Sequence, residues 1–592
     1  MLDILFVTFN SEKWIDGCIQ SLSQSTANLK EVSLYFVDNA STDGTVAKLH
    51  AVEETYGETF AQIRVHQSAE NLGFGRGNNL AAKLGKGEVL FCLNIDTTVY
   101  PDTLQCLLDA IAASDAGVGA WEARQMPYEH PKMYDPLTGE TTWASGAALA
   151  VRRSVFEEIG GFDESIFMYA EDVDLSWRIR AKNYTIHYLP GVVVNHYAYQ
   201  KAGEVKPTQY VYSILNNLLL RTKFGSRRDI VWWHAHFASV LLKKEQPFQG
   251  ARRALIGAYV KNLRCFFGGW RWKKKNLPLQ AQLRVKKFVG WDYEGCRDGV
   301  FYEHARCVNG PKVSVIVRTC GRPSVLRETL ISLRRQTYQN FEVVVVEDGA
   351  PKAERMIREE FDDLNIVYQA TGKKVGRSSV GNRALSLATG QYFNFLDDDD
   401  VFYADHLEVL VGELTRHPAY KAAYSLAFET PILVHSRDPY VYELLGHNGI
   451  YKQPFTRLVL VHHNYFPIQC VMFDRSVYEA RGGFDEALDM LEDWDLWVRY
   501  AAWTPFLYVH KTTSMYRVPA QRDERKERQQ LLDDALAQVH AKFAHYATQW
   551  SVEDIFQDVQ QLPSFQAMDE VRHSLVYRFA RKVRNLLRKV TG

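Results

Sequence analysis

The sequence has few cysteines and no long apolar run, and each absence excludes a class of protein. Eight cysteines occur among 592 residues, and no two of them have the CxxC spacing that is typical of zinc sites. We therefore expect reduced, buried thiols instead of a disulfide framework. No stretch of about 18 apolar residues runs without a charge, so the sequence predicts no membrane-spanning helix.

The sequence also lacks an excess of charge of either sign and a recognisable export signal. Lysine and arginine together number 70, as do aspartate and glutamate, which excludes a chain that binds polyanions over its whole surface but leaves local basic patches open. The first residues, MLDILFVTFN, are strand-like and lack the basic start of a signal peptide. Since no nucleic-acid-binding motif is recognisable either, we expect a cytoplasmic protein that does not bind nucleic acid.

A length of 592 residues exceeds one ordinary hydrophobic core and predicts two or three domains. Two sequence blocks recur at nearly the same separation. The block GGFDE stands at 160–164 and again at 482–486, and Glu-Asp-x-Asp-Leu stands at 171–175 and again at 492–496. Two separate blocks rarely recur in this way by chance, so we infer two homologous domains.

Both copies begin with a buried strand, a helix and a second buried strand. Strands and helices that alternate at this length predict right-handed βαβ units and a mostly parallel, Rossmann-like sheet. The predicted fold class is therefore α/β in two tandem domains. The expected elements are 4–8, 13–24 and 32–37 in the first copy, and 312–318, 324–336 and 341–346 in the second.

The repeat and the composition around it divide the chain into four segments. The two copies are expected at 1–205 and 311–520. Between them, 206–310 has a helical pattern with basic clusters, and we interpret it as a linker or extension. The remainder, 521–592, is predicted to form a helical tail.

Acidic and amide side chains stand where the predicted strands end, which is where open parallel sheets bind ligands. Asp38 and Asp348 follow the second strand of each copy, where a carboxylate can accept hydrogen bonds from a nucleotide. Turn formation explains these two residues equally well, since aspartate initiates turns.

The third strand of each copy also ends in acids. Asn94-Ile95-Asp96 ends it in the first copy, and Asp397–Asp400 in the second. Four consecutive acids repel one another unless a cation lies among them, and Mg²⁺ or Mn²⁺ prefers such oxygen ligands. A solvated acidic turn is the alternative.

A pair of acids opens a helical pattern in both copies, directly after the recurring glycine-rich loop. Asp172 and Asp493 are the second acids of these pairs, and either could act as a general base toward an incoming hydroxyl. The alternative is that both pairs only compensate the helix dipole.

Together these motifs closely resemble those of the family 2 glycosyltransferases, which have the GT-A fold and transfer sugars from nucleotide-diphosphate donors with inversion. The resemblance implies that Asp172 and Asp493 are catalytic bases and that Asp38 and Asp348 contact the nucleotide. It also implies that further residues bind the donor or a Mg²⁺ or Mn²⁺ ion. These are Asn94 and Asp397 for the nucleotide sugar, and Asp96 and Asp399 for the metal.

The first copy resembles the rhamnosyltransferase branch of the family in its Asn71–Asn79 and Leu93–Thr97 segments. This resemblance implies rhamnose transfer from dTDP-rhamnose. His196, which follows the last core strand, is expected to add a metal ligand, and His510 is the corresponding candidate in the second copy. In both cases the alternative is an ordinary structural histidine.

The expected function is a bifunctional enzyme that adds sugars to a growing, lipid-linked bacterial surface polysaccharide, such as O-antigen or capsule. One alternative is a single active domain with the other as scaffold or acceptor-binding module. A second is an alternating two-site polymerase, and a third is a carbohydrate-binding protein without activity.

The C-terminal segment 571–590 alternates basic and apolar residues at spacings of three and four. Such a helix would lie on an anionic membrane, which predicts peripheral attachment to the inner face of the cytoplasmic membrane. The basic and apolar clusters of 206–275 could add to the same surface. The alternative is a helix whose apolar face packs on the protein.

Overall fold

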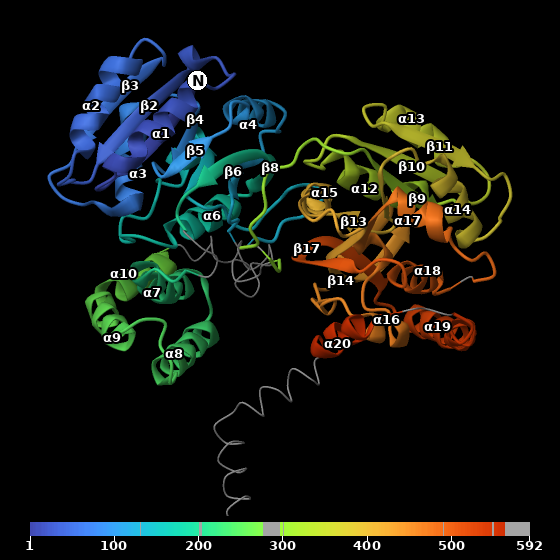
Figure 1. Ribbon diagram of the computed structural model, residues 1–592. Helices are drawn as coiled ribbons and strands as arrows, with labels where there is room; N and C mark the ends of the chain where they lie inside the picture. Colours follow the sequence, from blue (N-terminus) through green and yellow to red (C-terminus); the bar gives the residue numbers. More distant parts are fainter. Residues whose placement is uncertain are drawn as a thin grey trace, which may run out of the picture. The chain divides into compact units, whose positions relative to one another are not determined.

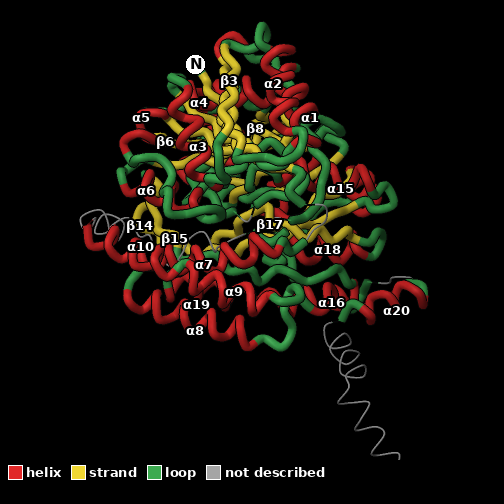
Figure 2. The backbone as a smooth tube through the Cα atoms, turned by 90° about the vertical axis from the view of Figure 1, so that its left-hand side faces the viewer, coloured by secondary structure: helices red, strands yellow, loops and turns green. Residues whose placement is uncertain are grey.

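The computed structural model divides into two compact units, Met1–Ala305 and Arg306–Gly592, which we describe separately (Figure 1). Strands form the interior of these units and helices surround them (Figure 2). The described residues are 1–130, 132–199, 204–275, 297–299, 301–488, 490–546 and 550–562.

The N-terminal unit is built on one eight-stranded sheet with the order β3-β2-β1-β4-β7-β6-β8-β5. Its first four strands are parallel, as predicted, whereas β7 is antiparallel to both β4 and β6. The sheet is therefore mixed, because β7 runs against both of its neighbours. The strands are β1 Leu2–Thr8, β2 Val32–Asp38, β3 Gln62–Gln67, β4 Val89–Leu93, β5 Thr97–Val99, β6 Val118–Met126, β7 Ala148–Arg152 and β8 Thr185–His196.

Helices cover both faces of this sheet, and the alternation of side chains along β1 shows why. Ile4 and Phe6 point into the core under α1 and α2, while Leu5 points into the core under α3 and α6. The helices are α1 Glu12–Ser23, α2 Thr45–Tyr56, α3 Gly73–Leu84, α4 Thr103–Ala112, α5 Arg153–Glu158 and α6 Glu171–Ala181. The helix predicted at 13–24 is thus confirmed as α1.

In the described part of this unit, four more helices follow β8 and form a small cluster, coloured green in Figure 1. They share their own core, in which Leu215 and Leu218 pack against Trp233, Phe237 and Leu255. Part of the predicted linker is therefore a packed helical subdomain of the N-terminal unit. The helices are α7 Pro207–Phe224, α8 Arg227–Leu242, α9 Ala251–Lys261 and α10 Leu263–Lys275.

The C-terminal unit repeats the sheet in the order β11-β10-β9-β12-β16-β14-β17-β13, and β15 extends it as a hairpin partner of β14. Its first four strands are parallel, and β16 runs antiparallel to β12. The strands are β9 Val313–Thr319, β10 Phe341–Glu347, β11 Ile366–Ala370, β12 Tyr392–Phe395, β13 Val401–Phe402, β14 Ala422–Arg437, β15 Tyr440–Leu444, β16 Val471–Asp474 and β17 Phe506–Pro519.

The helices of this unit include α12, which confirms the prediction at 324–336, and the long α19, which begins the predicted tail. Among the described residues, no helix is long and apolar enough to cross a membrane. The segment 571–590 lies outside the described residues, so its membrane helix stays a prediction. The helices are α12 Pro323–Arg334, α13 Glu354–Glu360, α14 Arg377–Leu387, α15 His406–Arg416, α16 Arg457–His462, α17 Arg475–Arg481, α18 Glu492–Ala501, α19 Arg522–Phe543 and α20 Val552–Gln560.

Candidate active sites

A cavity of about 420 Å³ opens in the N-terminal unit beyond the carboxyl ends of β1 and β4. It brings together four of the residues predicted from sequence, although they come from distant parts of the chain. These are Asn94, Asp96, Asp172 and His196.

Asp96 and His196 face each other across the antiparallel pair of β5 and β8, with 3.4 Å between the Asp96 Oδ1 and the His196 Nε2. The His196 Nδ1 lies 2.7 Å from the Gln125 Oε1, an acceptor, so in the neutral ring Nδ1 carries the proton. The lone pair of Nε2 is then directed toward the pocket. The Asn94 side-chain amide lies 3.3 Å from the same nitrogen.

This arrangement fits a divalent cation with two protein ligands, since a carboxylate oxygen and an imidazole lone pair converge at one point. In the absence of a metal ion, burial raises the pKa of Asp96, but a protonated His196, which donates from Nε2 and carries a charge, outweighs burial and lowers that pKa. Within the described residues no group of three or more His, Cys, Asp or Glu side chains could hold a metal. Any ion would therefore need further ligands from a substrate or water.

Asp172 is the second residue of α6 and lines the same cavity. Its carboxylate accepts hydrogen bonds from the backbone N–H groups of Gly146, at 3.0 Å, and Val173, at 2.8 Å. The helix begins abruptly because Ala170 adopts a left-handed conformation, with φ of 68°. Burial raises the pKa of Asp172, and burial together with the Asp172 charge raises that of Glu171 well above its usual range. A carboxylate with a raised pKa suits a general base.

Asp38 is the predicted nucleotide contact that the structure does not bring to the cavity. It is buried and accepts hydrogen bonds from the Thr8 hydroxyl and from both the N–H and the hydroxyl of Ser41. The next residue, Asn39, lines the cavity instead. The side chains of adjacent residues in a strand point to opposite sides of the sheet. Asp38 therefore points into the turn, while Asn39 points into the cavity.

Strand register shows that Asn39, and not Asp38, is the counterpart of Asp348. The backbone N–H of Asn39 donates to Thr8 at the end of β1, and that of Asp348 donates to Thr319 at the end of β9. Asp348 lines a cavity and accepts hydrogen bonds from the N–H groups of Val375 and Gly376. Asp38 and Asp348, the two predicted nucleotide contacts, therefore do not occupy equivalent positions in the two units.

Two adjoining cavities of about 450 and 500 Å³ form the corresponding site of the C-terminal unit. The smaller contains Asp348 and the four acids that follow β12, and the larger contains Asp493. The two cavities share part of their lining, so a ligand that extends through both would contact these shared residues. The shared residues are Arg318, Arg377, Asp397, Met490, Tyr516 and Arg528.

The four consecutive acids are balanced by arginines that follow β9. Arg318 forms a two-pronged pair with Asp397, at 2.8 and 2.9 Å. Arg322 pairs with Asp398 and, at 3.2 Å, with Asp399. The cation that this acidic run requires is thus supplied at least in part by the protein. Asp399 has the most exposed side chain of the four, at 39% against 29% for Asp397, and is the one that best fits an added metal ion.

Sequence reasoning missed Arg318 and Arg322, although a comparison of the copies would have revealed them. By strand register Arg318 takes the place of Val7, and Arg322 the place of Ser11. The C-terminal site therefore has fixed positive charge that the N-terminal site lacks at these positions.

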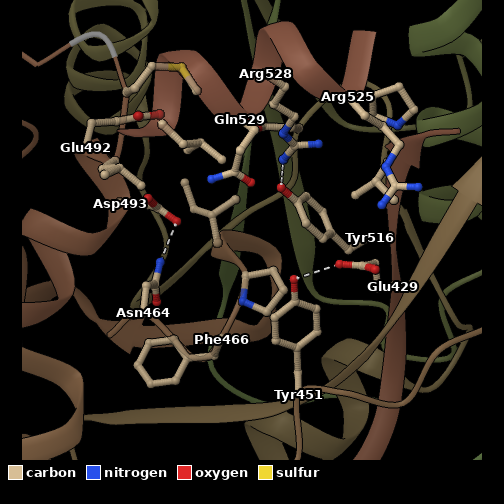
Figure 3. Close-up of a pocket in the computed structure, with 18 of the residues that line it drawn as sticks. Glu429, Tyr451, Asn464, Phe466, Glu492, Asp493, Tyr516, Arg525, Arg528 and Gln529 are labelled. Carbon is tan, nitrogen blue, oxygen red and sulfur yellow. Dashed lines mark hydrogen bonds between the residues drawn. The ribbon is translucent and has the colours of Figure 1, made fainter. Parts of the chain in front are cut away.

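Asp493 is the second residue of α18, in the place of Asp172. The Asn464 amide donates a hydrogen bond to its Oδ2 at 3.2 Å, and both residues border the larger cavity (Figure 3). Burial and then the neighbouring Glu492 raise the pKa of Asp493 to about 7. Glu492 is itself held by Arg318, at 2.8 Å. A carboxylate that lines a cavity and has a pKa near 7 suits the deprotonation of a hydroxyl.

The structure does not bring His510 to the site. His510 is exposed and stacks on Tyr508, whereas β13 pairs with β17 so that Tyr516 occupies the place that His196 has in the first unit. Tyr516 borders both cavities and accepts a hydrogen bond from Arg528 of α19 (Figure 3). The predicted metal ligand is therefore replaced by a phenol, because the register of a long strand could not be counted from sequence.

Helix α19 closes one side of the larger cavity with Arg525, Arg528 and Gln529 (Figure 3). On the other side stand Tyr451 and Glu429, whose side chains lie 3.4 Å apart. The predicted tail is thus part of the site and not an appendage.

Comparison with known protein families finds the same two copies that the sequence repeat indicates. The model of the family described as "Glycosyl transferase family 2" matches residues 3–174 and 314–481, together more than half of the chain. The N-terminal part is 28% identical over 282 residues to the N-acetylglucosaminyl-diphospho-decaprenol L-rhamnosyltransferase of Mycobacterium tuberculosis, which covers 40% of this chain and 87% of that protein. An uncharacterized glycosyltransferase of Rickettsia prowazekii is 24% identical over 215 residues, with 36% of this chain and 66% of that protein covered.

Solved structures give weaker likenesses. S. aureus TarS in complex with UDP-GlcNAc has a TM-score of 0.32 at 16% identity, over 48% of this chain and 92% of that chain. The mannosyltransferase PcManGT from Pyrobaculum calidifontis, in complex with GDP-Man and Mn²⁺, has a TM-score of 0.30 at 18% identity, over 49% and 87%. Scores this low add nothing to the sequence match. Because the family model covers both repeats, the chain belongs to glycosyl transferase family 2.

Proposed function

We propose that both units are active and that the chain is a bifunctional, inverting glycosyltransferase. The observation that carries this proposal is the matched position of Asp172 and Asp493. Each is the second residue of a helix that follows a left-handed residue, each borders a cavity, and each has a raised pKa. A copy kept only as a scaffold would gain nothing from a buried carboxylate of this kind.

In the proposed reaction the carboxylate takes the proton of an acceptor hydroxyl as that oxygen attacks the anomeric carbon of the donor. The bond from this carbon to the diphosphate breaks on the opposite side, which inverts its configuration. Arg322 and Arg377 stand in the cavity that holds Asp348 and could bind the departing diphosphate. A Mg²⁺ or Mn²⁺ ion, held by Asp96 and His196 in one unit and by Asp399 in the other, would neutralise the same charge.

For the N-terminal unit we propose rhamnose, from dTDP-rhamnose, as the transferred sugar. The M. tuberculosis relative is named as a rhamnosyltransferase that acts on a diphospho-decaprenol-linked sugar, which also supports a lipid-linked acceptor. The C-terminal unit would add a second sugar to the same bacterial surface polysaccharide, such as O-antigen or capsule, at the cytoplasmic face of the membrane. Tethering raises the effective concentration of one product at the next site.

Product analysis tests the proposal. The full chain is incubated with pairs of nucleotide sugars and a lipid-linked acceptor, and the products are resolved by mass. Two donors consumed in a fixed order would support two active sites. Consumption of one donor in single additions would show that one unit is silent, and repeated addition of an alternating pair would show a polymerase.

The raised pKa of Asp493 predicts a pH dependence of transfer by the C-terminal unit. A general base works only when deprotonated, so kcat/KM should fall about tenfold per pH unit below about 7 and level off above it. Measurement of initial rates between about pH 5 and pH 9 checks this. A profile flat down to about pH 5 would show that Asp493 is not the base.

The geometry of Asp96 and His196 predicts that transfer by the N-terminal unit depends on a divalent ion. Chelation should abolish it, and Mn²⁺ or Mg²⁺ should restore it. Replacing His196 with Gln removes one of two ligands and should raise the half-saturating metal concentration at least about tenfold. The matched substitution His510→Gln, at an exposed histidine, should leave the metal response of both units unchanged. An unchanged response in His196→Gln would exclude this site.

A further inference from the structure

Helices α8, α9 and α10 carry a concentration of exposed apolar side chains. Of the 25 exposed large hydrophobic residues in the described part of the chain, eight fall between positions 231 and 270. Trp232, Phe267 and Trp270 are 72%, 68% and 56% exposed, which is far more than a packing role requires. We call these eight residues the α8–α10 surface: Val231, Trp232, Leu242, Ile256, Val260, Leu263, Phe267 and Trp270.

The exposure is regular and not scattered. In α8, Trp233, Phe237 and Val240 are buried in the core of the subdomain. Val231 and Leu242 lie on the opposite side of the helix, since about 3.6 residues make one turn, and Trp232 lies on the flank between the two sides. Helix α8 therefore has two apolar faces, and only one of them is covered by the subdomain.

The same pattern holds in the next two helices. Ile256 and Val260 of α9 are four residues apart and share an exposed face. Leu263, Phe267 and Trp270 of α10 follow one another at spacings of four and three, which places them on one face as well. Three consecutive helices therefore each have an apolar stripe that the described residues leave exposed.

Basic residues are interspersed with these stripes. Residues 225–275 contain 12 Lys and Arg but only 2 Asp and Glu, whereas the whole chain has 70 of each sign. Arg252 and Arg253 lie one turn before Ile256, and Lys274 lies one turn after Trp270, with its Nζ 5.7 Å from the centre of that ring. Positive charge therefore flanks the exposed apolar stripes.

We propose that the α8–α10 surface binds an anionic membrane, with the apolar tips in the headgroup–acyl boundary and the basic side chains on lipid phosphates. Nucleic acid would explain the charge and the aromatic rings. It would not explain Val231, Leu242, Ile256 and Val260, which have no ring to stack on a base. Transfer from water into the hydrocarbon of a membrane is favourable in free energy for all eight side chains.

Helix α7 joins this surface rigidly to the N-terminal active site. The Asn216 amide donates hydrogen bonds to the backbone oxygens of Met168 and Tyr169, at 2.9 and 2.7 Å, in the loop before α6. Lys223 pairs with Asp163 at 2.6 Å and with Asp174 of α6 itself. Membrane docking would thus hold the cavity of Asp172 at a set position relative to the bilayer. The proposal goes beyond the transfer reaction and is tested without it.

The test is vesicle binding by the full chain. Binding to vesicles of phosphatidylcholine and phosphatidylglycerol should exceed binding to phosphatidylcholine alone and fall with salt. The triple variant Trp232→Gln, Phe267→Gln, Trp270→Gln should bind at least tenfold more weakly. Reversal of Arg252 and Arg253 to Glu should weaken binding about fivefold or more per residue.

A matched control replaces three exposed apolar residues elsewhere, Leu445, Ile450 and Trp503, with Gln and should bind like the wild type. All of these side chains are solvent-exposed, and circular dichroism will verify that each variant is folded. Hydrogen exchange with vesicles present gives a second, independent readout. Protection of 227–275 is the expected result.

Three results would overturn the proposal. One is wild-type binding by the aromatic triple variant. Another is vesicle-induced protection that is confined to residues after 562, which would assign binding to the C-terminal segment alone. The third is protection of 227–275 by single-stranded RNA but not by vesicles, which would assign the surface to nucleic acid.

Discussion

Replacing Asp493 with Asn should remove transfer by the C-terminal unit and leave transfer by the N-terminal unit intact. The amide has nearly the shape of the carboxylate but cannot take a proton, so the loss should be about a hundredfold to ten-thousandfold in kcat. Folding should be preserved, because the Asn oxygen can still accept a hydrogen bond from the Trp494 N–H, and its NH2 can donate to the Asn464 oxygen once that amide turns over. Initial rates with each donor, measured separately, check this.

The reciprocal variant, Asp172→Asn, should give the opposite pattern, and each variant serves as the control for the other. Its carboxylate holds the N–H groups of Gly146 and Val173, which an amide oxygen can also do in part. If both variants lose the same transfer, the two units share one reaction. If Asp172→Asn changes nothing while Asp493→Asn abolishes all products, the N-terminal unit is not a catalyst.

Replacing Arg318 with Gln should have the largest effect on stability. The guanidinium is nearly buried and holds Asp397 and Glu492 at once, through three hydrogen bonds. Its removal leaves two carboxylates without their partner and should lower the free energy of unfolding of the C-terminal unit by about 3–5 kcal/mol. Thermal unfolding of the full chain should show one transition moved and the other unchanged.

The same variant should also shift the pH profile. The charge of Arg318 lowers the pKa of Asp493, so without it that pKa should rise and the acid limb of C-terminal transfer should move to higher pH. Arg318→Lys should not restore the native profile, since a lysine lacks the fork that binds both oxygens of Asp397.

A matched control is Arg475→Gln, at an exposed pair with Glu479 at 2.9 Å. Loss of an exposed ion pair of this kind should lower the free energy of unfolding by less than about 1 kcal/mol. An equally small loss in Arg318→Gln would show that the arginine does not organise the site.

Local chemistry explains what could be read from sequence. The runs of apolar residues at 4–8 and 341–346 are buried strands because only an interior strand tolerates them, and the recurring Glu-Asp pairs mark the starts of α6 and α18. Asp96, His196 and Asp172 were found together because each follows a strand or loop end at the same edge of the sheet.

Strand register decided the positions that local sequence could not assign. Asp38 and Asn39 are neighbours in sequence, but they point to opposite sides of the strand end, and only the pairing of β1 with β2 shows which one meets the cavity. His510 and Tyr516 lie on the same strand, yet only the pairing of β13 with β17 brings Tyr516 to the acids.

The amino-acid sequence by itself determined the two copies, the α/β class, the family and the candidate base of each site, because these depend on local pattern and on motifs repeated within the chain. Tertiary structure alone decided which residues share a cavity. It placed Arg318 and Arg322 among the four acids and α19 over the larger cavity, and it left one side of α8, α9 and α10 uncovered. These are contacts between segments far apart in sequence, and no local pattern records the charge or surface that a distant segment will meet.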